Sequence, residues 1–215
     1  MRETKQKKKN IKECSIKDQW TEYFLKAESS MEEEWEAFIY PNIKDFCFDY
    51  TLELAPGAGR NTKKLIPFCN EIHLVELNSY ALNLCRFRFT DYSGKCAIYY
   101  HLNDGQSLSM ISDATITAVY TWDSAVHFDR LVIREYLKEF SRVLKPEGKI
   151  FLHHSNYGSF SDNTKFKKNP RWRSNMSAKL CKEYCSEFGL KVIKQHIMDW
   201  RGSKDLDCIS IIQKP

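Results

Sequence analysis

The chain lacks long apolar segments. No apolar run reaches the roughly 18 residues that a membrane-spanning helix needs, and the first 20 residues contain no apolar stretch of the kind found in a secretory signal. We therefore expect a protein without a membrane span that works in the cytoplasm.

Paired cysteine motifs are also missing, although the sequence has eight cysteines. Cys181 and Cys185 lie four residues apart in a helical pattern, which would suit two metal ligands, but no matching His or Cys pair stands nearby. The scatter argues against a disulfide framework and against a structural zinc site. Buried free thiols in a reducing compartment account better for these residues, so no metal is expected.

Broad disorder is not expected, because the hydrophobic fraction of 42% is close to the globular average and 215 residues suffice for one domain with a substantial core. The net charge of +5 arises largely at the start of the chain. The residues responsible are Arg2, Lys5, Lys7, Lys8, Lys9 and Lys12. We expect residues 1–17 to be a disordered, solvated arm, with contact to nucleic acid or an anionic surface as the alternative. Residues 18–215 would then form a single domain.

Strand and helix patterns alternate through most of that domain. A helical segment, 18–46, comes first and is interrupted by Pro41. The expected strands are 50–54, 71–77, 97–101, 116–121, 149–153, 190–200 and 206–213, and the expected helices are 61–69, 79–89, 129–144 and 177–188. Such alternation predicts an α/β fold in which helices cover both faces of a mostly parallel, doubly wound sheet. The short connection at Gly202 predicts a closing antiparallel hairpin.

Two long features of the second half bear on function. The helix 129–144 carries an apolar face, has Asp129 as N-cap, and ends at Lys145-Pro-Glu-Gly148. The polar stretch 155–176 is too long for a simple connection, and we interpret it as a lid or substrate-binding insertion.

The stretch Glu53-Leu-Ala-Pro-Gly-Ala-Gly-Arg60 is the most informative motif. Here an apolar strand turns on glycines into a helix, and Glu76 follows at the end of the next strand. Glycine lets a ligand approach the backbone, and a carboxylate at this distance accepts hydrogen bonds from ribose hydroxyls. The layout indicates a site for a nucleoside-containing cofactor.

With these marks the chain resembles the S-adenosylmethionine-dependent methyltransferases of the seven-stranded, Rossmann-like class, from Tyr50 to Lys214. Further marks are Asp104 in Leu102-Asn-Asp-Gly-Gln-Ser-Leu108 and the Arg142-Val-Leu-Lys-Pro-Glu-Gly148 turn. The resemblance implies S-adenosylmethionine as cofactor and S-adenosylhomocysteine as product, with Glu76 at the ribose and Asp104 at the adenine. It also places Glu53, Ala55, Gly57, Gly59, Leu77, Gly105 and Trp122 at the cofactor. Ala55 stands where the family often has its first glycine, and alanine is tolerable there if the backbone is extended.

The carboxyl ends of the fourth and fifth strands carry the candidates for catalysis. Methyl transfer to a hydroxyl needs a base, and histidine is the most common one. We expect His127 or His154 to be the base, with Asp123 beside it, whereas His153 is more simply explained by hydrogen bonds to loop backbone. A divalent metal bound by Asp123 and these histidines is an alternative, since some sugar methyltransferases use one, but the chain shows no compact ligand motif.

The insertion indicates the acceptor. Lysines and arginines surround Trp172, and Asp162 is the only acidic residue from 155 to 176. Arg171, Trp172 and Arg173 suit a phosphate or a sugar ring, and Asn156 and Tyr157 lie at the start of the same segment. The amino-acid sequence of this region resembles that of a bacterial subgroup of small methyltransferases associated with surface-polysaccharide and sugar modification. The resemblance implies O-methylation of a sugar, sugar phosphate or nucleotide-linked sugar.

Two other functions stay open. A methyltransferase for RNA or protein would use the basic arm as an anchor, but the Asn-Pro-Pro-aromatic sequence of nucleic-acid amino methyltransferases is replaced by Trp122-Asp123-Ser124. A non-catalytic cofactor-binding subunit would tolerate loss of Asp123, His127 and His154. We expect a small anionic or sugar substrate, no nucleic-acid partner, and a monomer or homodimer.

Overall fold

The computed structural model describes residues 5, 7–9, 11–12 and 27–215. Its centre is one seven-stranded sheet of order β3-β2-β1-β4-β5-β7-β6, in which only β7 runs antiparallel to its neighbours. The strands are β1 Tyr50–Leu54, β2 Glu71–Glu76, β3 Ala97–Leu102, β4 Ile116–Thr121, β5 Leu144–Ser155, β6 Lys191–Trp200 and β7 Ser203–Gln213. The predicted fold, including the closing hairpin, is confirmed.

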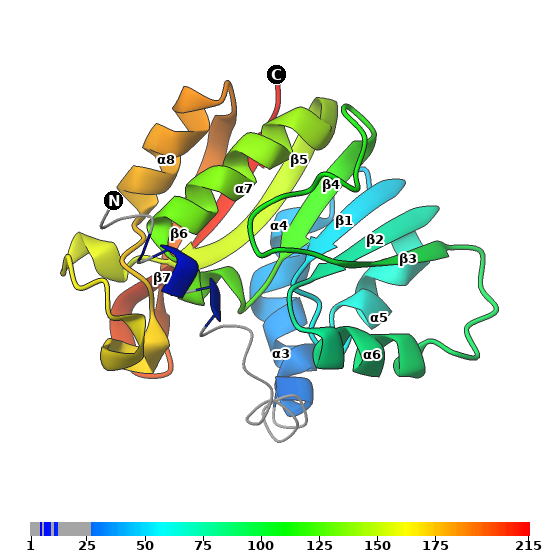
Figure 1. Ribbon diagram of the computed structural model, residues 1–215, viewed down its shortest axis with the longest axis horizontal. Helices are drawn as coiled ribbons and strands as arrows, with labels where there is room; N and C mark the ends of the chain where they lie inside the picture. The colour runs from blue at the N-terminus through cyan, green and yellow to red at the C-terminus, as the bar shows by residue number, and fades with distance from the viewer. Residues whose placement is uncertain (1–4, 6, 10, 13–26) are drawn as a thin grey trace.

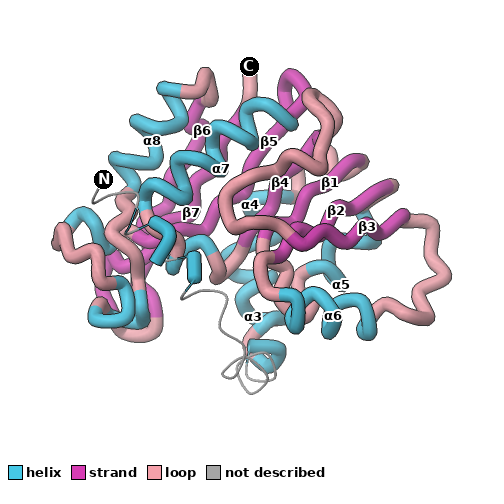
Figure 2. Tube along the Cα trace, in the orientation of Figure 1, coloured by secondary structure: helices cyan, strands magenta, loops and turns pink. Residues whose placement is uncertain are grey.

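Helices lie on both faces of the sheet (Figures 1 and 2). The longer ones are α6 Ser79–Arg88, α7 Arg130–Val143 and α8 Ala178–Glu187, and the short ones are α3 Met31–Glu34, α4 Tyr40–Ile43 and α5 Thr62–Leu65. Single turns occupy Ile66–Phe68, Ala125–His127, Tyr157–Ser159, Phe166–Lys168 and Pro170–Trp172. Among the described residues, no helix has the length and apolar character needed to span a membrane.

Alternation along the strands divides the core into two layers. Leu152 of β5 packs with α7 and α8 on one face, whereas Phe151 packs with the N-terminal helices and α5 on the other. The middle strands are buried on both faces, as expected for a parallel sheet covered by helices.

The predicted N-cap of α7 is confirmed, whereas the two predicted breaks at prolines differ from the structure. Asp129 caps α7 by accepting from the Leu131 N–H at 2.9 Å. Pro41 does not interrupt the N-terminal helix. It lies in the first turn of α4, directly after a π-helical turn at Trp35–Ile39, so the missing N–H breaks no α-helical ladder. The predicted turn after α7 instead joins β5, which begins at Leu144.

Candidate active site

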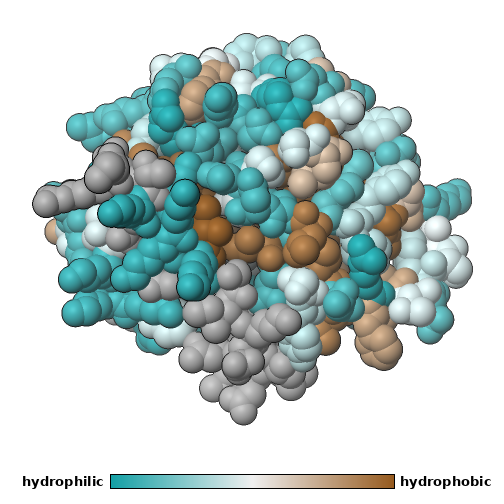
Figure 3. Space-filling view, in the orientation of Figure 1, coloured by the Kyte–Doolittle hydropathy of each residue, from teal (hydrophilic) through white to brown (hydrophobic). Residues whose placement is uncertain are grey.

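A cavity opens at the carboxyl ends of the first four strands, where the strand order reverses between β1 and β4. It has a volume of about 790 Å³ including its open mouth. Figure 3 shows hydrophobic surface across the middle of this face, and the cavity walls include Leu54, Val75 and Val132. The predicted site residues on its wall are Ala55, Gly57, Glu76, Leu77, Gly105, Asp123 and His127.

The glycine turn lines the cavity through Ala55 and Gly57. Both have left-handed backbone, with φ of 57° and 58°. An extended backbone, the condition under which alanine would be tolerated here, is therefore not found. The chain needs at this position the conformation that glycine adopts freely and alanine adopts at a cost of roughly 1–2 kcal/mol. The strained alanine lies directly against the space for a ligand.

Gly59 serves packing rather than the cavity. Its φ is 81°, and a Cβ at this position would lie 2.8 Å from both Cys85 Sγ and Phe89 Cε2. It does not line the cavity, in contrast to the prediction that it contacts the cofactor. The missing side chain lets the turn press against α6.

Glu76 is buried and directs its carboxylate to the backbone around the cavity. Oε2 accepts from Gly57 N at 3.1 Å, and Oε1 accepts from Leu77 N at 2.8 Å and Asn78 N at 2.9 Å. Burial raises its pKa, and these three hydrogen bonds act in the opposite direction. An ionised carboxyl has about four acceptor positions. Three of them bind these backbone N–H groups, and one more is available on Oε2.

Glu53, also predicted at the cofactor, does not line the cavity. It is buried behind the glycine turn, where its Oε2 accepts from the Thr62 hydroxyl at 2.6 Å. Burial raises its pKa to about 8. Its observed contacts thus support the turn from behind.

The loop after β3 reaches the cavity through neighbours of Asp104. Asn103 and Gly105 line it, whereas the Asp104 carboxylate is exposed and accepts from the N–H groups of Gln106 and Ser107 at 3.0 and 2.8 Å. Asn103 donates to the Tyr136 hydroxyl at 2.8 Å. The adenine contact of Asp104 remains a prediction.

Part of the basic arm covers this region. Ile11 lines the cavity and packs against the core, and Lys7 Nζ lies 3.7 Å from Glu135 Oε1 on α7. The described residues 5, 7–9 and 11–12 are helical, and the disorder expected for residues 1–17 as a whole stays a prediction. In the sequence, the apolar Ile11 among lysines was the signal for this contact.

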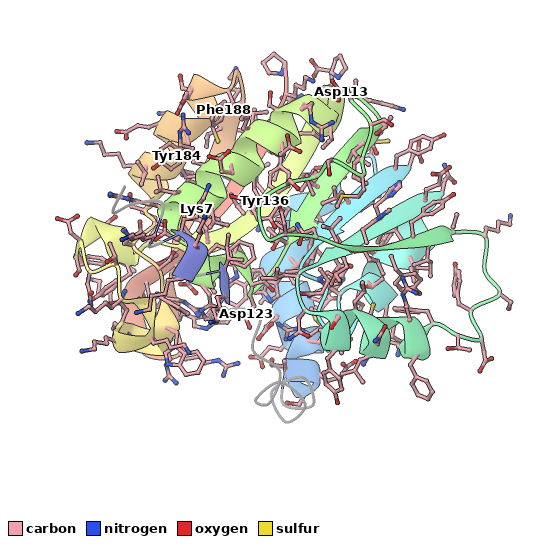
Figure 4. The ribbon with its side chains drawn as sticks, viewed as in Figure 1. Lys7, Asp113, Asp123, Tyr136, Tyr184 and Phe188 are labelled. Atoms are coloured by element: carbon pink, nitrogen blue, oxygen red, sulfur yellow. The ribbon has the colours of Figure 1, made fainter. Side chains whose placement is uncertain are left out.

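Asp123 stands at the end of β4 beside the cavity (Figure 4). Its φ is 54°, and its Oδ2 lies 3.2 Å from the Arg60 guanidinium. Arg60 directly follows the glycine motif, and the sequence pattern predicted no role for it. The turn that begins at Ala125 then places His127 on the same cavity wall.

The ring of His127 is oriented by the insertion. Its Nδ1 lies 2.9 Å from the carbonyl oxygen of Trp172. Burial and the nearby Arg173 guanidinium lower its pKa, so the imidazole is neutral near pH 7. A neutral imidazole is the form that accepts a proton.

The other two histidines of the prediction lie inside the protein. His154 is fully buried; Nε2 contacts the Ser210 hydroxyl at 2.8 Å and Nδ1 the Ser155 carbonyl at 2.8 Å. The expectation that His154 faces the cavity is therefore wrong, because the side chain contacts Ser210 of β7 and Cys181 of α8. His153 is also buried, and accepts from the Asp123 backbone N–H at 3.1 Å, in agreement with its structural interpretation.

Trp122 lies under the site rather than on the main cavity wall. Its Nε1 donates to Glu34 at 2.8 Å, and its ring stacks on His153 with 4.2 Å between centroids. It lines a smaller adjoining pocket together with Ala55, Gly57 and Arg60.

The insertion residues separate into three roles. Arg173 is buried and makes a two-bond pair with Asp207, at 2.7 and 2.6 Å. Asn156 is likewise buried and holds backbone of Asp205 and Ala178. Arg171 and Trp172 are exposed, and Tyr157 packs against the core. Among the predicted substrate contacts, only Arg171 and Trp172 therefore present exposed side chains beside the His127 loop.

The metal alternative finds no ready ligand set. Across the described part of the chain, no group of three or more His, Cys, Asp or Glu side chains is arranged to hold a metal ion. Cys181 and Cys185, both in α8, are buried in the core.

Comparison with known proteins supports the methyltransferase class that the sequence resembles. Residues 51–148 match the family model described as a methyltransferase domain. No curated protein matches the chain.

Solved structures of low sequence identity share the fold. An S-adenosylmethionine-dependent methyltransferase from Leishmania major is 14% identical, with a TM-score of 0.72 over 96% of this chain and 82% of that one. The N-methyltransferase NodS from Bradyrhizobium japonicum, in complex with S-adenosyl-L-homocysteine, is 15% identical, with a TM-score of 0.68 over 98% of both chains.

Geranyl diphosphate C-methyltransferase from Streptomyces coelicolor is 10% identical, with a TM-score of 0.68 over 86% of this chain and 76% of that one. The fold is thus that of the class I methyltransferases. The comparisons support methyltransferase activity with S-adenosylmethionine as the cofactor.

Proposed function

We propose that this protein transfers the methyl group of S-adenosylmethionine to a hydroxyl of a small polar acceptor, a sugar, sugar phosphate or nucleotide-linked sugar of a surface-polysaccharide pathway. The observation that carries the proposal is that Glu76 and His127 lie on the walls of one cavity. One is a ribose acceptor and the other a base, so cofactor binding and proton removal would occur side by side.

The cavity has the chemistry that an adenosyl cofactor requires. The Glu76 carboxylate retains an acceptor position for a ribose hydroxyl, Gly57 and Gly105 keep the backbone accessible, and the apolar walls suit an adenine ring. When bound, the cofactor supplies an electrophilic methyl group on a sulfonium.

The residues of the chain then have to align the acceptor and take its proton. His127 is neutral near pH 7 and its Nδ1 donates to the Trp172 carbonyl, so Nε2 carries the lone pair that takes the proton. The negative charge of Asp123 favours the imidazolium that forms. Arg60 keeps that carboxylate in place.

The acceptor class is supported by the insertion. Lys165, Lys167, Lys168 and Arg171 are exposed next to Trp172, over whose ring the Lys167 ammonium lies at 5.9 Å. Such a surface favours a phosphate-bearing or otherwise anionic sugar. The sugar itself is inferred by likeness to a subgroup.

The direct test is a screen of sugar nucleotides and sugar phosphates with S-adenosylmethionine, scored by mass for the gain of one methyl group. Amines and prenyl diphosphates belong in the same screen, because the similar structures include an N- and a C-methyltransferase. Strongly salt-dependent methylation of RNA would favour the nucleic-acid alternative instead.

His127→Gln separates an enzyme from a cofactor-binding subunit. If His127 is the base, the variant loses about 10² to 10⁴ in kcat while S-adenosylhomocysteine affinity is retained. Turnover equal to that of the wild type would remove His127 from the mechanism. Turnover of no acceptor class by the wild type would favour the subunit.

Glu76→Ala tests the cofactor site. Removing the carboxylate deletes a charged acceptor and leaves the N–H groups of Gly57, Leu77 and Asn78 without it, so S-adenosylmethionine binding should weaken by about 1.5–3 kcal/mol. Calorimetric titration measures this. Glu71→Ala, in the same strand but away from the cavity, is the matched control and should bind as the wild type does.

A further inference from the structure

The contact between His127 and the insertion determines which ring nitrogen carries the proton. Nδ1 of His127 lies 2.9 Å from the Trp172 carbonyl oxygen. A carbonyl only accepts hydrogen bonds, so Nδ1 must donate, and in the neutral ring the lone pair then resides on Nε2. The position of one backbone carbonyl thus selects the tautomer.

That carbonyl is held by an unusual backbone segment. Arg171 and Trp172 have φ of 50° and 57°, in the left-handed region that these residue types rarely adopt. The next residue, Arg173, sends its side chain inward, where Nε and Nη2 donate to the two carboxylate oxygens of Asp207 at 2.7 and 2.6 Å. The following N–H, of Ser174, donates to the Val126 carbonyl at 2.9 Å. Such strain persists only where surrounding bonds over-determine it.

Asp207 also reaches the other side of the site. Its Oδ2 lies 3.2 Å from His153 Nε2, and His153 Nδ1 accepts from the backbone N–H of Asp123 at 3.1 Å. Asp123 itself has φ of 54°. One fully buried carboxylate of β7 is therefore linked to both residues that the proposed function places at the acceptor: to Asp123 through His153, and to His127 through Arg173 and the preceding Trp172 carbonyl.

We infer that Arg173 and Asp207 are positioning residues, which set the Nδ1–H tautomer of His127 through the Trp172 carbonyl and hold Asp123 through His153. Neither residue lines the cavity. The catalytic part of this inference rests on the proposed function, because it takes His127 as the base; the tautomer itself does not.

The first test uses the wild-type protein and needs no substrate. Nitrogen-15 spectra of histidine-labelled protein distinguish the two tautomers, and His127→Gln identifies the signal among the six histidines. We expect a neutral ring protonated at Nδ1. A ring protonated at Nε2 would overturn the inference directly, whatever the variants do.

The second test is Arg173→Lys, which keeps the positive charge beside His127 but cannot make the two-bond pair. We expect a mixed or Nε2–H tautomer at His127 and a loss of roughly tenfold or more in kcat, with an unchanged KM for S-adenosylmethionine. Arg134→Lys is the matched control. It breaks a two-bond pair with Glu187 on the surface between α7 and α8 and should leave the His127 signal unchanged.

The outcomes separate the two proposals. An Nδ1–H signal that stays unchanged in a folded Arg173→Lys variant, with the other histidine signals at their wild-type positions, contradicts the positioning role. If Arg173→Lys does not fold, Asp207→Asn provides the same comparison. A tautomer that shifts as expected while His127→Gln retains full turnover would leave the positioning contact established and remove His127 as the base.

Discussion

At the residue scale, Glu53 and Glu76 show how surroundings divide two buried carboxyls between roles. Glu76 receives three backbone N–H groups at the cavity, which support its ionised form. Glu53, in the preceding strand, receives one hydroxyl hydrogen from Thr62, and burial raises its pKa to about 8. Near neutral pH, Glu53 is therefore largely protonated, which avoids a buried charge behind the cofactor turn.

Glu53 should make stability depend on pH. Its folded pKa of about 8 exceeds the ordinary value of 4.5, so proton binding stabilises the folded protein fully below pH 4.5, and that contribution is lost as the pH rises through about 8. We expect the unfolding free energy of the wild type to fall by a few kcal/mol, on the order of the linkage term, between about pH 5 and 8.5.

Glu53→Gln removes the titrating group at nearly constant size. Urea unfolding at several pH values should show a flatter dependence for this variant than for the wild type. Equal slopes for the two proteins would mean that Glu53 titrates normally in the folded state.

At the scale of elements, Gly59 determines how closely the glycine turn packs against α6. Gly59 has φ of 81°, and its Hα side faces Cys85 and Phe89. Both a strained backbone and a clash would follow from any side chain here. The same glycine pattern that suggested a ligand contact thus also serves helix packing.

Gly59→Ala is expected to destabilise the protein by about 2–4 kcal/mol, since an alanine must bear the left-handed conformation and displace two neighbours. Gly202→Ala isolates the first term, because Gly202 has φ of 84° and nothing within 4 Å of a Cβ; about 1 kcal/mol is expected there. Denaturant midpoints of both variants measure the difference. Similar losses in the two variants would contradict the packing role.

At the scale of the whole molecule, the charged insertion 155–176 contacts a cavity whose walls come mainly from earlier residues. The insertion docks against the turn of His127 through Trp172 and Ser174, and through Arg173 against the closing hairpin. Its lysines remain exposed. Under the proposed function, cofactor and acceptor recognition would reside in separate parts of the sequence.

Replacing Lys165, Lys167 and Lys168 by Gln should raise the KM for an anionic acceptor several-fold and weaken its salt dependence, because exposed charges act through screened attraction. The KM for S-adenosylmethionine should not change. The control replaces Lys179, Lys182 and Lys191, which are equally exposed on α8 and β6. Steady-state kinetics at low and high salt decide, and an equal effect of both triple variants would exclude a local acceptor surface.

Local patterns predicted the elements well. The bounds of β1 and β4 agree with the sequence prediction, and Asp129 caps α7 as expected. The glycine turn and Glu76 came from spacing alone, because a strand, a tight turn and a second strand are contiguous in the chain. The break predicted at Pro41 and the extended backbone that would suit Ala55 are not found. The π-helical turn before Pro41 and the left-handed backbone of Ala55 both depend on packing.

The sequence by itself determined the order of strands and helices, the ligand-binding edge of the sheet and the carboxylate at its second strand, because these follow from periodicity and from short-range spacing. Only the tertiary structure decided which histidine meets the cavity and which arginine is buried. His127 and His154, or Arg171 and Arg173, carry the same chemistry in sequence, but their surroundings differ. Pairing of β5 with β7 buries His154 and the ion pair with Asp207 buries Arg173, whereas His127 lines the cavity and Arg171 is exposed.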